Sequence, residues 1–194
     1  MIYLDNSSTT RPHPLVIKAV VSAMENTFGN PSSLHRLGLE AEKVVKEARQ
    51  EVASLISALP EEIVFTSGGT ESNNLALIGT AMAYKRSGNH IITTKIEHPS
   101  IHNPLSILRD MGFRISYLSV DEYGRINPKE LLDEICDETI LVSIMYVNNE
   151  VGVVQDISGL SKLMKEKKPD ILFHVDGIQG VVVHEREEVK NALN

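Results

Sequence analysis

Short apolar runs alternate along the chain with longer segments in which apolar residues recur at helical spacing. The short runs end in polar or glycine-rich sequence, which is typical of buried parallel strands. We predict strands at 62–65, 89–94, 113–118, 140–147 and 171–175, and helices at about 14–26, 33–57, 75–84, 99–111, 127–136 and 157–167. This alternation predicts an α/β fold with three layers, in which a largely parallel sheet has helices on both faces.

Composition and charge narrow the class of protein and its partners. The chain has 194 residues, of which 42% are hydrophobic and 23% charged, enough for one domain with a core. A net charge of -7 argues against a nucleic-acid partner. We predict no membrane span, because no apolar run is long enough, and no signal peptide or metal motif. With Cys136 as the single cysteine, a cytoplasmic location fits.

The chain is organised around a glycine loop between a predicted strand and a predicted helix. Gly68, Gly69 and Thr70 follow the strand at 62–65. Glycine allows close approach of a ligand to the backbone, and a helix N-terminus attracts anions, so the loop predicts a phosphate site. The loop lacks the lysine of a P-loop and the third glycine of a dinucleotide site. The same residues also fit a plain glycine turn without a ligand, and locally both interpretations stay open.

Polar side chains follow three further predicted strands. His98 comes after the strand at 89–94, Asn149 after 140–147, and Asp176 and Gln179 after 171–175. A lone histidine is usually structural or solvated. In open α/β sheets, however, the carboxyl ends of the strands form the edge where ligands bind. Together with the glycine loop, these residues predict a pocket with a phosphate cradle at one end and a carboxylate at the other.

Pyridoxal 5'-phosphate matches such a pocket. Its phosphate suits a helix N-terminus. Its ring nitrogen requires a carboxylate, which keeps the pyridinium protonated so that the ring accepts electrons. A histidine ring can stack on the pyridine face, and an amide can donate to the ring oxygen. A nucleoside triphosphate would instead require a lysine in the glycine loop.

Six motifs follow one another along the chain. They are Asp5-Asn6-x-x-Thr9-Thr10, Phe28-Gly29-Asn30-Pro31-Ser32-Ser33-x-His35, Phe65-Thr66-Ser67-Gly68-x-Thr70-Glu71-Ser72-Asn73-Asn74, Glu97-His98, Val142-Ser143-Ile144-Met145-x-Val147-Asn148-Asn149-Glu150-x-Gly152 and His174-Val175-Asp176. In their order and approximate spacing the chain resembles cysteine desulfurases of the NifS/IscS type, which are fold-type-I, pyridoxal-phosphate enzymes of aminotransferase class V. The resemblance covers roughly 1–180 and implies a cofactor-binding large-domain portion there, with a divergent tail at 181–194.

The resemblance implies cofactor-binding roles for individual residues. Gly69 and Thr70 would hold the phosphate, although the family more often has alanine where Gly69 stands. Asp176 would pair with the ring nitrogen. Asn149 and Gln179 would hydrogen-bond the region of the ring oxygen.

The resemblance also implies a catalytic residue and a reaction. His98 would stack on the pyridine ring and take part in proton transfer. The family converts L-cysteine to L-alanine and leaves the sulfur as an enzyme persulfide, for iron–sulfur clusters and other sulfur-containing products. A selenocysteine lyase, another class V enzyme, or a non-catalytic binding module with the same fold are the alternatives.

Two parts of the family pattern have no match in the chain. The Schiff-base lysine segment is absent, and Lys190, the only lysine after Asp176, lacks its context. The nucleophilic cysteine loop is absent too, and Cys136 lies on a predicted helix instead. We therefore expect a truncated or split chain without significant desulfurase turnover alone. It would bind a complementary C-terminal chain, a homodimer partner or a sulfur-acceptor protein.

Overall fold

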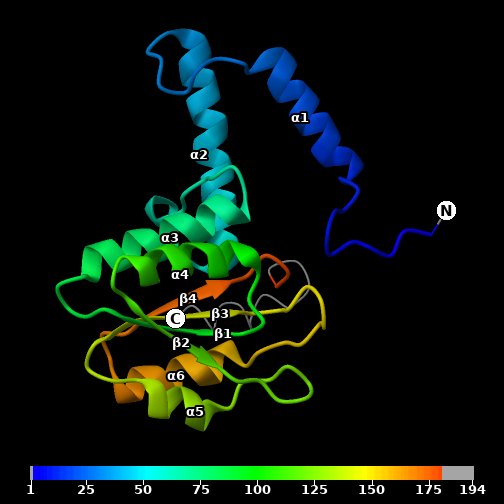
Figure 1. Ribbon diagram of the computed structural model, residues 1–194. Helices are drawn as coiled ribbons and strands as arrows, with labels where there is room; N and C mark the ends of the chain where they lie inside the picture. Colours follow the sequence, from blue (N-terminus) through cyan, green and yellow to red (C-terminus); the bar gives the residue numbers. More distant parts are fainter. Residues whose placement is uncertain (1, 181–194) are drawn as a thin grey trace. The chain divides into compact units, whose positions relative to one another are not determined.

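The computed structural model describes residues 2–180, which form two compact units divided after Phe65 (Figure 1). The first unit contains α1 (Pro14–Asn26), α2 (Arg36–Ile56) and a 3-10 turn, η1 (Pro60–Glu62). Both predicted helices of this unit are confirmed. The N-cap of α2 is His35, whose Nδ1 accepts the backbone N–H of Gly38 at 3.2 Å.

The strand predicted at 62–65 is wrong. Ile63 is buried, but Val64 and Phe65 are exposed, and the described residues of this unit contain no strand that could pair with them. An extended segment becomes a strand only when a partner satisfies its backbone groups. Here Arg49 holds the segment instead, because its guanidinium lies 4.9 Å from the centroid of the Phe65 ring and donates to the Ile63 carbonyl.

The second unit is built on a four-stranded parallel sheet in the order β2-β1-β3-β4. Its strands are β1 (His90–Thr94), β2 (Arg114–Leu118), β3 (Thr139–Met145) and β4 (Leu172–Asp176). Its helices are α3 (Gly69–Tyr84), α4 (Pro99–Asp110), α5 (Pro128–Glu134) and α6 (Ile157–Lys167). Helices α3 and α4 lie on one face of the sheet and α5 and α6 on the other (Figure 1). The predicted three-layer α/β fold is confirmed.

Alternating strand residues supply a core on each face of the sheet. Ile91 and Leu141 pack with Leu77 of α3 and with α4. Their neighbours Ile92 and Val142 point to the opposite face and pack with α5 and α6. All five side chains are essentially inaccessible to solvent. Burial on both faces explains why β3 is a continuous apolar run in the sequence.

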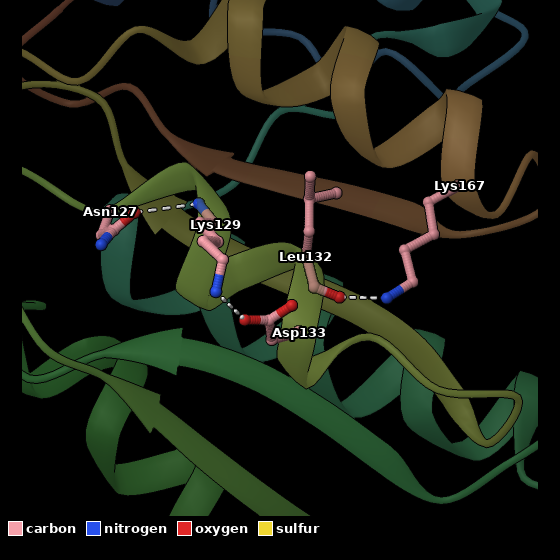
Figure 2. A network of polar contacts seen from close by, with 5 residues as sticks. All are labelled: Asn127, Lys129, Leu132, Asp133 and Lys167. Carbon is pink, nitrogen blue, oxygen red and sulfur yellow. Dashed lines mark hydrogen bonds and ion pairs between the residues drawn. The ribbon is translucent and has the colours of Figure 1, made fainter.

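Polar contacts connect α5 to α6 on the outer layer (Figure 2). The Asn127 side chain caps α5 by accepting the Lys129 backbone N–H at 2.9 Å. Lys129 also pairs with Asp133 one turn later, with 3.1 Å between Nζ and Oδ2. The ammonium of Lys167 in α6 donates to the carbonyl of Leu132 in α5. These contacts fix the helices that lie opposite α3 and α4.

Two expectations from the sequence concern the chain's ends and the membrane. The tail predicted at 181–194 lies outside the described residues. Within 2–180, none of the helices has both the length and the apolar character needed to cross a bilayer.

Candidate functional site

The carboxyl ends of β1, β3 and β4 bring most of the predicted site residues to one edge of the second unit. His98 follows β1, Asn149 follows β3, and Asp176 is the last residue of β4. The Met145 and Asp176 positions are register partners, so β3 and β4 end side by side. Asn148 connects β3 to the loop after β1, because its Nδ2 donates to the Ile96 carbonyl at 2.8 Å.

Helix α3 begins at Gly69, earlier than the apolar pattern predicted, so Gly69 and Thr70 lie in its first turn. The N-cap residue is Gly68, which has no side chain to accept the first backbone N–H groups of the helix. The Glu71 carboxylate instead reaches back to Ser67 and accepts its backbone N–H and its hydroxyl, both at 2.6 Å. These two hydrogen bonds lower the pKa of Glu71. The loop is thereby fixed while the N–H groups of the first turn remain directed out of the helix.

Gly69 also packs closely against the turn after β4. A Cβ atom at this position would lie 2.6 Å from Cδ1 of Ile178 and 3.1 Å from its Cγ1. The N-terminus of α3 therefore lies close to this turn. Because the Ile178 side chain is exposed, a methyl group at position 69 would displace only the end of that side chain.

Asp176 at the end of β4 is buried, with only 3% of its surface exposed. Its Oδ2 accepts from Asn73 Nδ2 at 2.9 Å, and its Oδ1 accepts the backbone N–H of Ile178 at 3.1 Å. A carboxylate can accept about four hydrogen bonds, so Asp176 retains capacity for a further donor such as a protonated ring nitrogen.

Asn73 joins Asp176 to His98 through Ser100. The Asn73 nitrogen lies 2.9 Å from Ser100 Oγ, and Ser100 Oγ lies 2.8 Å from His98 Nδ1. His98 is the N-cap of α4, and its Nδ1 accepts the Ser100 backbone N–H at 3.1 Å. The His98 side chain is exposed at the edge of the sheet. Two residues predicted from separate strands therefore belong to one hydrogen-bonded row.

Glu97 is a second buried carboxyl group near Asp176. Its Oε1 accepts from Thr94 Oγ1 at 2.7 Å and from the Met145 backbone N–H at 3.0 Å. Its Oε2 is buried and has no hydrogen-bond partner among the described residues. Burial raises the pKa of Glu97 to about 7, the two hydrogen bonds oppose this rise, and the nearby charge of Asp176 adds to it.

The two consecutive asparagines after β3 differ in their surroundings. Asn148 is buried and its Oδ1 accepts the backbone N–H groups of Glu150 and Val151, both at 2.9 Å, so it builds the turn. Asn149 is half-buried at the same edge. Gln179 is also half-buried and lies in the turn that follows Asp176. The turn places Gln179 next to Ile178, which contacts the N-terminus of α3.

Cys136 lies at the opposite edge of the sheet, just before β3 begins. Its Sγ is 3.0 Å from Nη2 of Arg114, the first residue of β2, and 3.4 Å from Thr139 Oγ1. It also lies 3.6 Å from Nδ1 of His90, the first residue of β1. Burial lowers the pKa of His90 to about 4, which keeps this imidazole neutral. Cys136 is thus separated by the length of the strands from the edge that carries Asp176.

Sequence reasoning assigned no role to Asn73, Ser100 or Glu97, although Asn73 and Glu97 stand in two of the quoted motifs. The signal for Asn73 was present, because it lies four residues before Leu77 and eight before Ala81, both buried in α3. A polar residue on the buried stripe of a helix requires a partner. Ser100 and Glu97 lie within two residues of His98, but their contacts to Asn73 and to Met145 come from distant parts of the chain and leave no trace in local spacing.

The family model described as "Aminotransferase class-V" matches residues 2–192. The chain belongs to the class V aminotransferase family. "Cysteine desulfurase IscS" of Pseudoalteromonas translucida (strain TAC 125) is 47% identical over 194 residues, which cover 97% of this chain and 47% of that protein. The predicted resemblance to cysteine desulfurases is confirmed.

Solved structures agree with this family assignment. A "NIFS-LIKE PROTEIN" has a TM-score of 0.88 and 37% identity, over 90% of this chain and 48% of its own. "SspA in complex with cysteine" has a TM-score of 0.84 and 35% identity, over 89% of this chain and 49% of its own. The chain thus spans about half the length of the relatives it matches.

Proposed function

We propose that this chain forms the cofactor-binding part of a pyridoxal-phosphate-dependent cysteine desulfurase. The observation that carries the proposal is the buried carboxylate of Asp176 at the end of β4, in one hydrogen-bonded row with His98. A buried carboxylate at a strand end is the group that a pyridinium nitrogen requires. The names of the relatives, which are cysteine desulfurases, support the substrate class.

The chemical groups at this edge suit those of pyridoxal phosphate. Asp176 would receive the ring nitrogen, and the exposed His98 would cover the ring face. Gly69 and Thr70 in the first turn of α3 would donate to the phosphate. Bound there, the cofactor would supply an electron sink for carbanion chemistry at the amino acid.

The remaining two predicted residues complete the contacts to the ring. Asn149 after β3 and Gln179 after β4 are half-buried amides at the same edge. An amide N–H is a suitable donor to the ring oxygen. In the proposed overall reaction, L-cysteine transfers its sulfur atom to an enzyme thiol, and the products are L-alanine and an enzyme persulfide. We expect the 194-residue chain alone to bind the cofactor without significant turnover.

Titration with pyridoxal phosphate tests the proposal. We expect a saturable change in the absorbance spectrum of the cofactor with the wild-type chain. Asp176→Asn should weaken binding roughly tenfold to a hundredfold, because a buried hydrogen bond to a charged group contributes about 1.5–3 kcal/mol. Asp170→Asn is the matched control, since Asp170 is exposed just before the other end of β4. Circular dichroism of each variant checks that it is folded.

Two results would contradict the proposal. One is the absence of saturable binding by the folded wild-type chain. The other is equal affinity for wild type, Asp176→Asn and Asp170→Asn. Borohydride treatment followed by mass spectrometry reports separately whether any lysine of this chain becomes attached to the cofactor.

A further inference from the structure

A row of buried hydrogen bonds connects β4 to the start of α4 through α3. Its central members, Asn73 and Ser100, are 4% and 6% exposed. The proposed function gives neither Asn73 nor Ser100 a contact with the cofactor. The three side-chain hydrogen bonds of the row are 2.8–2.9 Å long. Its two ends are Asp176 and His98, the residues assigned to the ring nitrogen and the ring face. The hydrogen atoms available to these groups determine the direction of every bond.

Asn73 must direct its nitrogen toward Asp176. In the opposite orientation, its oxygen would face a carboxylate oxygen, and neither atom could donate. The amide nitrogen carries two hydrogens, and its two acceptors are Asp176 Oδ2 and Ser100 Oγ, both at 2.9 Å. Ser100 Oγ is therefore an acceptor toward Asn73. Its own hydrogen is left to donate to His98 Nδ1 at 2.8 Å.

A second donor reaches the same nitrogen of His98. The backbone N–H of Ser100 lies 3.1 Å from Nδ1 and can only donate. Nδ1 therefore carries no proton in this arrangement, and the neutral imidazole carries its proton on Nε2. The two ring nitrogens point in different directions, so Nε2 is not directed at the Ser100 groups that contact Nδ1.

We propose that Asn73 and Ser100 are positioning residues that link Asp176 to His98 and hold neutral His98 with its proton on Nε2. This inference rests on the proposed function, in which His98 covers the cofactor ring. In this tautomer, Nε2 of His98 is a hydrogen-bond donor. For neutral His98 to take a proton at Nε2, it would first have to adopt the other tautomer and lose its bonds at Nδ1.

Nuclear magnetic resonance of the chain without cofactor tests the tautomer directly. Long-range ¹H–¹⁵N spectra of the histidine rings separate a proton on Nε2 from one on Nδ1, and loss of a signal set in His98→Gln assigns His98. We expect Nε2–H in the wild type. Ser100→Ala removes one of the two donors to Nδ1 and keeps the backbone N–H, so it should raise the fraction of Nδ1–H above that of the wild type. Ser100→Thr, which keeps the hydroxyl, should restore the wild-type fraction. Ser106→Ala is the control, since Ser106 lies in the same helix and contacts Arg109 instead.

Cofactor affinity provides a second measurement. Loss of one neutral hydrogen bond, about 1 kcal/mol, should lower the affinity of Ser100→Ala for pyridoxal phosphate roughly fivefold, with Ser100→Thr close to wild type. A proton on Nδ1 in the wild type would overturn the proposal, and so would a wild-type tautomer ratio in Ser100→Ala. The ring spectra need no cofactor, so they decide the tautomer even if the wild type fails to bind and the proposed function is wrong.

Discussion

Replacing Glu97 with glutamine should change the pH dependence of stability in a predictable way. Glu97 is 6% exposed, and its Oε2 has no hydrogen-bond partner among the described residues. Burial raises its pKa from the ordinary 4.5 to about 7. The folded chain therefore holds this proton more tightly than the unfolded chain. The bound proton on Glu97 stabilises the folded chain fully below pH 4.5, and this stabilisation is lost as the pH rises through 7.

The magnitude follows from the two pKa values. The interval between 4.5 and about 7 corresponds to roughly 3 kcal/mol of unfolding free energy. Glutamine has nearly the same shape, keeps an acceptor for Thr94 and Met145, and has no charge to bury. The free energy of unfolding of Glu97→Gln minus that of the wild type should therefore rise by roughly 3 kcal/mol as the pH increases from 4.5 to 8.

Urea unfolding followed by circular dichroism at a series of pH values measures this difference. His90 and His174, whose pKa values burial lowers, also change stability below about pH 6.5, but both proteins contain them and their effects cancel in the difference. Glu71→Gln is a control of opposite sign, because hydrogen bonds lower the pKa of Glu71. A difference between Glu97→Gln and wild type that stays constant from pH 4.5 to pH 8 would refute the reasoning.

The packing of the second unit gives two further predictions, each with a matched control. Leu105→Ala should cost about 2–5 kcal/mol in urea unfolding, because Leu105 is fully buried in α4, whereas Ile107→Ala on the exposed face should cost about 0.5 kcal/mol or less. Equal losses would show that the two faces are misassigned. Gly88→Ala should lower the melting temperature, because its Cβ would collide with the Glu138 carbonyl. Gly79→Ala, in open space on α3, should instead stabilise by about 0.5–1 kcal/mol; a loss there comparable to that of Gly88→Ala would contradict the packing.

The alternation of elements in the second unit was predictable because its signals are local. Each parallel strand is buried on both faces and reads as an apolar run, and each helix shows its own stripe. The start of α3 was placed too late, because glycine, threonine and asparagine at 69–74 are weak helix formers. The strand at 62–65 was predicted wrongly, since pairing depends on a neighbour that local sequence cannot reveal.

The site was predictable only in part, for a related reason. His98, Asn149 and Asp176 could be proposed because each follows a recognisable strand and parallel strands end at one edge. The row through Asn73 and Ser100 depends on contacts between residues 27 and 103 positions apart in the chain. Only the three-dimensional arrangement of α3, α4 and β4 shows which of several polar residues make those contacts.

The most direct test of the central claim is a titration of the ¹⁵N-labelled chain with pyridoxal phosphate, followed by amide ¹H–¹⁵N spectra. Binding at the carboxyl edge of the sheet predicts saturable shifts in the amides of Gly69 and Thr70, which face the phosphate, and in those around His98 and Asp176. The amides around Cys136, at the opposite edge, should not move. Shifts centred on Cys136, or no saturable shift anywhere, would contradict the assignment of this edge as the cofactor site.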